Sequence, residues 1–200
     1  ECYADLLWNS KRPIALAAMD NGNRVIHCGS FSKTIAPALR VGYLVADWHL
    51  LSQILAVKND SGTGALEQMM LAEYCVNHFD DHVNKLSSTL KDKLETLVEA
   101  VKVYFGTSAE FEVPEGGIFL WVSLPEHVDT IRLSQLAAKE GIAINPGPEW
   151  STDTKPASSK LRLCFGHPSK KIIEEGVSKL AEICHQEFGV PLRGANRVRS

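Results

Sequence analysis

Four residues between positions 30 and 40 carry side chains that could bind an anion or attack a carbonyl carbon: Ser30, Ser32, Lys33 and Arg40. A lysine amine forms a Schiff base with a carbonyl carbon when the amine is partly neutral. Serine hydroxyls donate hydrogen bonds to phosphate oxygens, and a guanidinium can donate two parallel bonds. These residue types at this spacing predict that Lys33 carries a cofactor and that its neighbours hold the cofactor's phosphate.

Two apolar runs must position this cluster. Residues 24–27 have the length and β-branching of the end of a buried strand, and residues 41–46 form a second apolar run. Glycine and proline punctuate the stretch between them, which predicts a loop. A lone lysine and arginine would be interpreted as solvated surface charges, and the serines as turn residues. The position of the whole string between two strands favours the anion site.

The composition is that of a globular protein. The chain has 200 residues, of which 44% are hydrophobic and 22% charged, with a net charge of -3. This charge gives no global basic surface for nucleic acid, and no apolar run approaches the roughly 18 residues of a membrane span. The chain begins with no signal peptide and no methionine, so we expect it to be a piece of a longer protein. Its five scattered cysteines predict reduced thiols in a cytoplasmic protein.

The remaining pattern predicts an α/β fold in three parts. Residues 1–64 contain the loop and its flanking strands. Residues 65–105 show a helical period of apolar side chains, which residues 78–82 are expected to interrupt, giving two helices. The pattern of residues 106–200 predicts a strand, a helix, two strands and a final helix over residues 170–188.

The string around Lys33 also resembles a family signature. It runs Ser30-Phe31-Ser32-Lys33-Thr34-Ile35-Ala36-Pro37-Ala38-Leu39-Arg40-Val41-Gly42-Tyr43. The string is similar to the lysine signature of fold-type I, class I/II aminotransferases, which depend on pyridoxal 5'-phosphate (PLP). Within that superfamily it most resembles the branch shared by the 2-aminoadipate-type aminotransferases and the aminotransferase-like domains of MocR-type regulators of the GntR family. Three later segments resemble the family's small-domain strand, its Pro-Gly turn and its arginine-bearing strand: residues 115–122, 142–148 and 161–165.

The resemblance implies a role for each residue of the opening cluster. Lys33 would form the internal aldimine with PLP and later move a proton between the substrate Cα and the cofactor's C4′ carbon. Ser30, Ser32 and Arg40 would hold the phosphate. No metal ion is implied.

Two further residues receive roles from the resemblance. Tyr3 would bond the cofactor's phenolic oxygen, and Arg162 would receive the substrate's α-carboxylate, a bidentate contact that lysine makes less well. The alternatives are a core tyrosine for Tyr3 and a surface ion pair on an edge strand for Arg162.

The resemblance further implies that the chain is the C-terminal half of such a protein. Residues 1–64 would end the large PLP-binding domain, residues 65–105 would form the linking helices, and residues 106–200 the small C-terminal domain. The family's aspartate facing the pyridine nitrogen would fall one residue before Glu1. We therefore expect the isolated 200 residues to be inactive or very weak. The intact protein would be a homodimer that transfers an amino group between an α-amino acid and a 2-oxo acid.

Other chemical interpretations fit the motifs less well. The spacing of Ser30 and Lys33 fits the Ser-x-x-Lys of penicillin-recognising acyl enzymes, but the chain has no Ser-Asp-Asn element. Cys164 and His167 have a Cys-x-x-His spacing, and zinc sites usually need a second such pair, which is missing.

The main alternative belongs to another functional class. In MocR-type regulators an aminotransferase-like domain senses a ligand, and a DNA-binding module precedes it. The sequences of segments 146–148 and 165–168 favour the regulator branch. Such a module would lie upstream of this chain, so nucleic acid would be a partner only through it.

Overall fold

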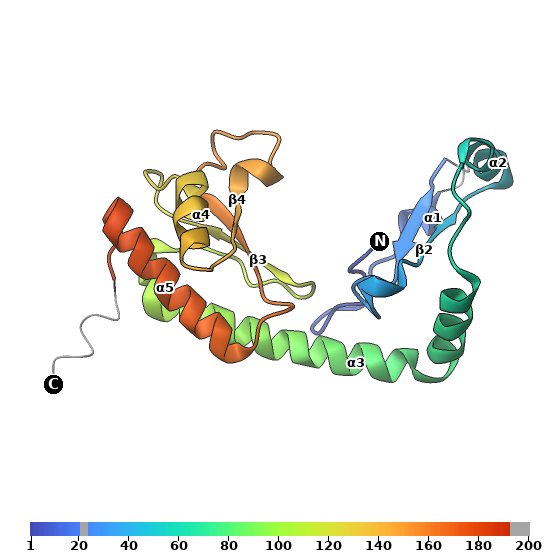
Figure 1. Ribbon diagram of the computed structural model, residues 1–200, viewed down its shortest axis with the longest axis horizontal. Coiled ribbons are helices and arrows are strands. Elements are labelled where there is room, and N and C mark those ends of the chain that lie inside the picture. The colour runs from blue at the N-terminus through green and yellow to red at the C-terminus, as the bar shows by residue number, and fades with distance from the viewer. Residues whose placement is uncertain (21–23, 193–200) are drawn as a thin grey trace. The chain divides into compact units, whose positions relative to one another are not determined.

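The computed structural model describes residues 1–20 and 24–192 (Figure 1). The chain divides into two compact units. Unit 1 comprises residues 1–88 and 115–117, and unit 2 comprises residues 89–114 and the described residues from 118 onward. One helix, α3, contributes residues to both units, so the division falls inside a helix.

Unit 1 is built around an antiparallel pair of strands, β1 (His27–Ser30) and β2 (Gly42–Val45). Ser30 pairs with Gly42 at one end of the pair and His27 with Val45 at the other. The short helix α1 (Leu16–Met19) precedes the strands, η1 (Pro37–Leu39) lies between them, and α2 (Trp48–Val57) follows. The predicted loop therefore closes the end of this pair.

The first strand begins later than the sequence predicts. The apolar run suggested a strand over residues 24–27, but β1 begins at His27 and includes the small residues that follow. The physical reason is local: the Asp20 carboxylate accepts hydrogen bonds from the backbone amides of Arg24 and Val25, at 2.5 and 2.9 Å. These amides are therefore satisfied by a side chain instead of a neighbouring strand.

Close approach of an aromatic ring explains the glycine within β1. A Cβ atom at Gly29 would lie 2.0 Å from Cζ of Tyr43, which is Gly29's partner across the strand pair. The Tyr43 ring also stacks on His27 and contacts Phe31, with ring centroids 5.9 and 5.6 Å apart. Glycine at this position lets the ring cover the strand that leads into the Lys33 loop.

The long helix α3 (Ala65–Tyr104) is continuous over 40 residues. The predicted interruption at residues 78–82 is wrong. That segment contains neither glycine nor proline, so nothing in it removes a helical hydrogen bond. The segment continues one helix, in which His78, Asp80 and Asp81 are exposed and His82 is half-buried.

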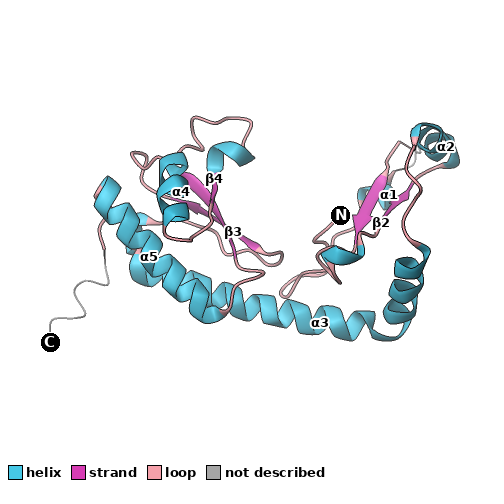
Figure 2. Ribbon diagram, viewed as in Figure 1, coloured by secondary structure: helices cyan, strands magenta, loops and turns pink. Residues whose placement is uncertain are grey.

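Unit 2 contains a three-stranded antiparallel sheet in the order β3 (Phe119–Ser123), β5 (Lys160–Cys164), β4 (Asn145–Pro146) (Figure 2). Its helices are α4 (Thr130–Lys139) and α5 (Lys170–Phe188), with η2 (Gly106–Ser108) and η3 (Gly147–Trp150) between elements. The predicted last helix is confirmed. It begins after Ser169, whose hydroxyl accepts from the Ile172 amide, and ends at the left-handed Gly189.

Strand alternation separates the core of unit 2 from its other sheet face. Leu120 and Val122 of β3, and Leu161 and Leu163 of β5, are buried. The same core takes in helix residues that are also buried: Leu133, Ala137, Val177, Leu180 and Ala181. The remaining residues of β3 and β5 therefore point to the opposite face of the sheet.

Unit 1 buries far less of its apolar surface. All four residues of β2 are exposed, and α2 contains no buried residue. Trp48 and Leu66 are 68% and 67% exposed. Within the described part of the chain, no helix has both the length and the apolar character needed to cross a membrane.

A pair of glycine substitutions tests the packing of unit 2. In Gly147→Ala, the new Cβ would lie 2.4 Å from the Ala157 carbonyl oxygen and 2.6 Å from that of Lys160, so backbone must move. We expect the free energy of unfolding to fall by about 2 kcal/mol or more, measured by urea denaturation followed by circular dichroism.

The matched control is Gly176→Ala inside α5. Nothing lies within 4 Å of a Cβ at that position, and alanine favours a helix interior by about 0.5–1 kcal/mol over glycine. The same substitution should therefore stabilise the protein at Gly176 and destabilise it at Gly147. Equal effects at both positions would contradict the packing described for η3.

Candidate functional site

Two serine hydroxyls meet at the end of β1. The Ser30 hydroxyl donates to Oγ of Ser32 at 3.0 Å, and the Ser32 backbone amide donates to Oγ of Ser30 at 3.2 Å. Both side chains are half-buried. Because the hydroxyls lie one hydrogen bond apart, both can rotate to donate to oxygens of one phosphate group.

Lys33 lies in a turn held by backbone hydrogen bonds. The Phe31 carbonyl oxygen accepts from the amides of Ile35 and Ala36, at 2.9 and 3.1 Å. The Lys33 side chain is exposed, and within residues 1–20 and 24–192 its amine has no hydrogen-bond or ion-pair partner. The turn therefore holds Lys33 directly after Ser32 in the chain, with its side chain exposed.

A histidine from α3 contacts the same turn. His82 Nε2 lies 2.8 Å from the Thr34 carbonyl oxygen, and its Nδ1 lies 3.0 Å from the Tyr74 hydroxyl. Sequence reasoning missed this contact. The helical spacing of His78 and His82 was visible, but it indicated only a solvated face or a helix junction. The bonded carbonyl is 48 residues away along the chain, so the local pattern could not reveal the contact.

Arg40 has an unusual backbone conformation at the end of η1. Its φ of 51° and ψ of 38° place it in the left-handed region, and among the described residues it is the single non-glycine residue with positive φ. Its Nη1 donates to the Pro37 carbonyl oxygen at 3.0 Å. A conformation of this kind carries a strain of about 1 kcal/mol or more, and such strain is concentrated at functional sites.

The surroundings of Arg40 form a concave surface. A cavity of about 330 Å³ is lined by Arg40 and by residues of the α2–α3 connection and the start of α3: Lys58, Asp60, Gly62, Thr63, Gly64 and Glu67. Lys58 and Asp60 form an ion pair there, and the Lys58 ammonium holds the pKa of the Asp60 carboxyl below its usual range. Arg40 thus belongs to the same loop as the serines, with its side chain bonded to the loop's own backbone.

Tyr3 lies in the N-terminal segment, which runs beside β1. The Tyr3 carbonyl oxygen accepts from the Leu6 amide at 2.9 Å, and the Glu1 amine donates to the Cys28 carbonyl oxygen. Tyr3 is half-buried. The segment is therefore held against the strand that leads into the Lys33 turn.

The acidic group nearest to Tyr3 in sequence is already engaged. Arg12 donates to Glu1 Oε2 at 2.8 Å and to Asp5 Oδ1 at 2.7 Å. The hydrogen bond from Arg12 lowers the pKa of the Glu1 carboxyl. Glu1 is therefore a structural ion-pair partner of Arg12, in agreement with its exclusion from the role facing a pyridine nitrogen.

Arg162 belongs to unit 2, on the sheet face opposite the core. It lies in the central strand β5, opposite Trp121 of β3 and Asn145 of β4. Its Nη2 donates to Asn145 Oδ1 at 3.3 Å. Its guanidinium carbon lies 3.9 Å from the centroid of the Phe119 ring and 3.3 Å from that of the Trp150 ring.

The aromatic contacts restrict how Arg162 can bind a ligand. The two rings therefore occupy part of the space around the guanidinium. The N–H donors lie along the edge of this planar group, and a carboxylate that makes a bidentate contact approaches along that edge. The Arg162 Nε is buried and has no hydrogen-bond partner, and an unpartnered donor of this kind favours an acceptor that completes it.

Other chemistries find little support in the described residues. Within residues 1–20 and 24–192, no three or more histidine, cysteine or acidic residues are grouped so that they could hold a metal ion. Cys184 is fully buried, and burial raises the pKa of its thiol to about 12. A thiol with such a pKa is a poor nucleophile at neutral pH.

Comparison with known proteins identifies the family. The family model described as "Aminotransferase class I and II" matches residues 1–180. The chain therefore belongs to the class I and II aminotransferases. It is 28% identical over 189 residues to an aromatic-amino-acid aminotransferase of Thermococcus litoralis, and 34% identical over 184 residues to the HTH-type transcriptional regulator NorG of Staphylococcus aureus.

These matches cover most of this chain but less than half of the curated relatives. The two alignments include 93% and 90% of the chain, and 45% and 40% of the relatives. Among solved structures, the multiple substrate aminotransferase of Thermococcus profundus matches with a TM-score of 0.84 and 30% identity, over 94% of this chain and 47% of that one. LysN, the alpha-aminoadipate aminotransferase of Thermus thermophilus, matches with a TM-score of 0.87 and 25% identity, over 96% and 50%. The α/β fold is thus about half of an aminotransferase chain, as the sequence predicts.

Two substitutions at Arg40 measure the strain of its backbone. Both Arg40→Gly and Arg40→Ala remove the hydrogen bond to Pro37, but only glycine adopts the left-handed conformation freely. We expect the glycine variant to be more stable than the alanine variant by about 1 kcal/mol in urea denaturation. At an unstrained position alanine is more stable than glycine by about 0.4–1 kcal/mol, because glycine has more freedom in the unfolded chain. An alanine variant that is more stable than the glycine variant by this amount would mean that the left-handed conformation stores no strain.

Proposed function

We propose that this member of the class I and II aminotransferases carries PLP on Lys33 and transfers amino groups between α-amino acids and 2-oxo acids. The observation that carries the proposal is the free Lys33 amine, presented by a turn whose neighbouring hydroxyls converge. When bound, PLP supplies an electron-withdrawing ring that stabilises negative charge at the substrate Cα. The chain's own residues bind, orient and move protons around it.

The loop residues fit the phosphate of this cofactor. The hydroxyls of Ser30 and Ser32, 3.0 Å apart, can each donate to a phosphate oxygen once they stop bonding each other. The remaining donors of the Arg40 guanidinium add charge and a planar contact. Retention of a strained arginine at this position, where glycine would relieve the strain, supports a role for the side chain in binding.

Lys33 has two tasks in the proposed reaction. Its amine would hold the cofactor through a Schiff base, which forms from an amine and an aldehyde with loss of water. Once released from the cofactor, the same amine would accept the proton at the substrate Cα and return it as a general acid. Tyr3, held beside β1, would donate its hydroxyl hydrogen bond to the cofactor's phenolic oxygen.

Arg162 would bind the α-carboxylate that all amino acid substrates share. The stacked Phe119 and Trp150 rings hold the guanidinium plane, and Asn145 accepts from one of its amino groups. Such a pre-oriented plane loses little rotational freedom when a carboxylate binds. The buried, unpartnered Nε would gain an acceptor.

The active protein would include more polypeptide than this chain. The chain spans 45% and 40% of two curated relatives, and unit 1 exposes large apolar side chains. We infer that further segments cover this surface and supply the carboxylate that faces the pyridine nitrogen. The active form would be a homodimer.

A second function is supported by one specific observation, the 34% identity to the regulator NorG. In that case the same Lys33 and Arg162 would hold PLP or its amino acid adduct as a signal, and a module outside this chain would contact DNA. The two functions differ in turnover. A transferase converts many equivalents of amino acid and 2-oxo acid per site, and a sensor converts at most one.

The role of Lys33 can be tested on the full-length protein that carries this chain. After addition of PLP and reduction with borohydride, we expect mass spectrometry to find the pyridoxyl group on Lys33. In Lys33→Ala the label and the visible absorbance band should both be lost, and transamination should fall by at least about a hundredfold.

Lys58→Ala is the matched control, because Lys58 also lies in unit 1 but pairs with Asp60. That variant should keep the label on Lys33. A pyridoxyl group found on another lysine of the unsubstituted protein would refute the assignment.

The role of Arg162 predicts a change in substrate binding. In Arg162→Lys, KM for the amino acid should rise about tenfold or more, while the affinity for PLP stays unchanged, because lysine cannot make the in-plane bidentate contact. Cys164→Ser, an exposed position on the same face of the same strand, should leave KM unchanged. An unaltered KM in Arg162→Lys would show that the carboxylate binds elsewhere.

A further inference from the structure

We propose that His82 is a positioning residue for Lys33. His82 donates a hydrogen bond from Nε2 to the Thr34 carbonyl oxygen and thereby anchors the Lys33 turn to α3. The importance of Lys33 in this inference rests on the proposed function. The hydrogen bond that anchors the turn does not depend on a bound cofactor. Thr34 directly follows Lys33, so the anchored peptide is adjacent to the proposed reactive residue.

The chemistry of the two atoms fixes the direction of this bond. A carbonyl oxygen can only accept, so at 2.8 Å His82 must carry its proton on Nε2. In the neutral ring Nδ1 is then an acceptor, and the Tyr74 hydroxyl, 3.0 Å away, is its donor. The two bonds form one chain from Tyr74 through His82 to Thr34, in which each bond polarises the next.

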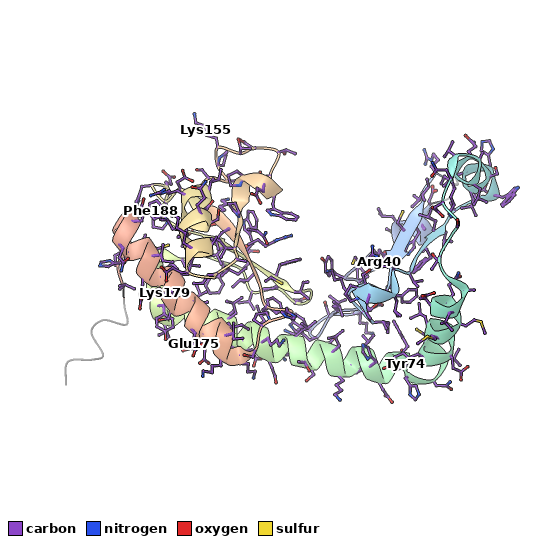
Figure 3. All side chains as sticks on the ribbon, viewed as in Figure 1. Arg40, Tyr74, Lys155, Glu175, Lys179 and Phe188 are labelled. Atoms are coloured by element: carbon purple, nitrogen blue, oxygen red, sulfur yellow. The ribbon has the colours of Figure 1, made fainter. Side chains whose placement is uncertain are left out.

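Helix periodicity places the members of this chain. Tyr74, His78 and His82 follow one another at intervals of four residues and lie on one stripe of α3. The Tyr74 ring contacts both histidines, with ring centroids 5.4 and 5.7 Å apart. Figure 3 labels Tyr74 on the part of α3 that belongs to unit 1. The helix thus holds the His82 ring in one orientation.

Few hydrogen bonds connect the turn to other parts of unit 1. The amides of Ile35 and Ala36 both donate to the Phe31 carbonyl oxygen, which closes the turn, and the Phe31 amide donates to the Val41 carbonyl oxygen at 3.2 Å at the beginning of the turn. Thr34 is 3% exposed, so water cannot readily replace His82 at a buried carbonyl. The bond from His82 connects the turn to a separate element and thereby fixes where the Lys33 side chain begins.

The anchor can be measured without cofactor by amide hydrogen exchange. His82→Gln keeps a donor at nearly the reach of Nε2, whereas the amide of His82→Asn ends about where Nδ1 lies and is too short. We expect the amides of Ile35 and Ala36 to exchange about five- to tenfold faster in His82→Asn than in the unsubstituted protein. In His82→Gln the exchange should be close to that of the unsubstituted protein.

His78→Asn is the matched control. It makes the same substitution one turn earlier on the same stripe, and no hydrogen bond joins His78 to the turn among the described residues. Exchange at Ile35 and Ala36 should be unchanged in this variant. Equal exchange in His82→Asn and His78→Asn, or exchange in His82→Gln as fast as in His82→Asn, would overturn the proposal.

A second measurement connects the anchor to the chemistry of Lys33. In the full-length protein, the rate at which PLP becomes reducible onto Lys33 should fall about fivefold or more in His82→Asn and recover in His82→Gln. An unchanged rate in His82→Asn would overturn the positioning role even if hydrogen exchange revealed the anchor. Absence of any label on Lys33 in the unsubstituted protein would instead refute the proposed function, and the exchange experiment would still decide the anchor.

Discussion

The pairing of β1 with β2 determines where the chemistry of unit 1 can lie. Because Ser30 is bonded opposite Gly42, everything between them is confined to a loop at one end of the strand pair. The serines, the lysine and Arg40 all fall in or at the edge of that loop. The Tyr43 ring covers Gly29 across the strand pair, so a side chain at position 29 would displace the ring. The strand pairing therefore gathers these four side chains into one loop, which the hydrogen bond from His82 also connects to α3.

Strand pairing also positions the side chain of interest in unit 2, where that side chain lies on a sheet instead of in a loop. Arg162 lies on the central strand, so it has a neighbour on both sides, Trp121 and Asn145. Strand alternation directs the leucines on either side of it into the core and leaves the guanidinium on the opposite face. Phe119 and Trp150 then fix its plane. Secondary-structure geometry thus places the Lys33 loop at one end of the strand pair in unit 1 and the Arg162 guanidinium on the sheet face opposite the core in unit 2.

The sequence predicted those parts that depend on local signals. The helix over 170–188 has a serine cap and a terminal glycine, and β5 has strict alternation, so both were found. The start of β1 was misjudged because the Asp20 side chain satisfies amides that a strand would otherwise pair. The break predicted within α3 was wrong because polar residues were taken as a boundary although no helix-breaking residue accompanies them.

Contacts between distant segments explain what the sequence could not reveal. The motif around Lys33 indicated the family, and the family is confirmed. The roles of Lys33, Arg40 and Arg162 stay predictions. The bond from His82 to Thr34 joins positions 48 residues apart, and neither residue type signals it. The aromatic rings that flank Arg162 come from β3 and η3, whose approach to β5 depends on sheet register and on the close packing of Gly147.

A strained backbone conformation and a buried donor without an acceptor occur at two of the residues with proposed roles, and their occurrence there bears on function. The strained backbone of Arg40 and the buried Arg162 Nε without an acceptor each make the protein less stable than it could be. An orphaned donor alone does not identify a site, because the buried Ser87 hydroxyl also lacks a partner. The two arginines differ from Ser87 in kind, because a guanidinium carries a positive charge and donates hydrogen bonds in a planar arrangement that suits an anion.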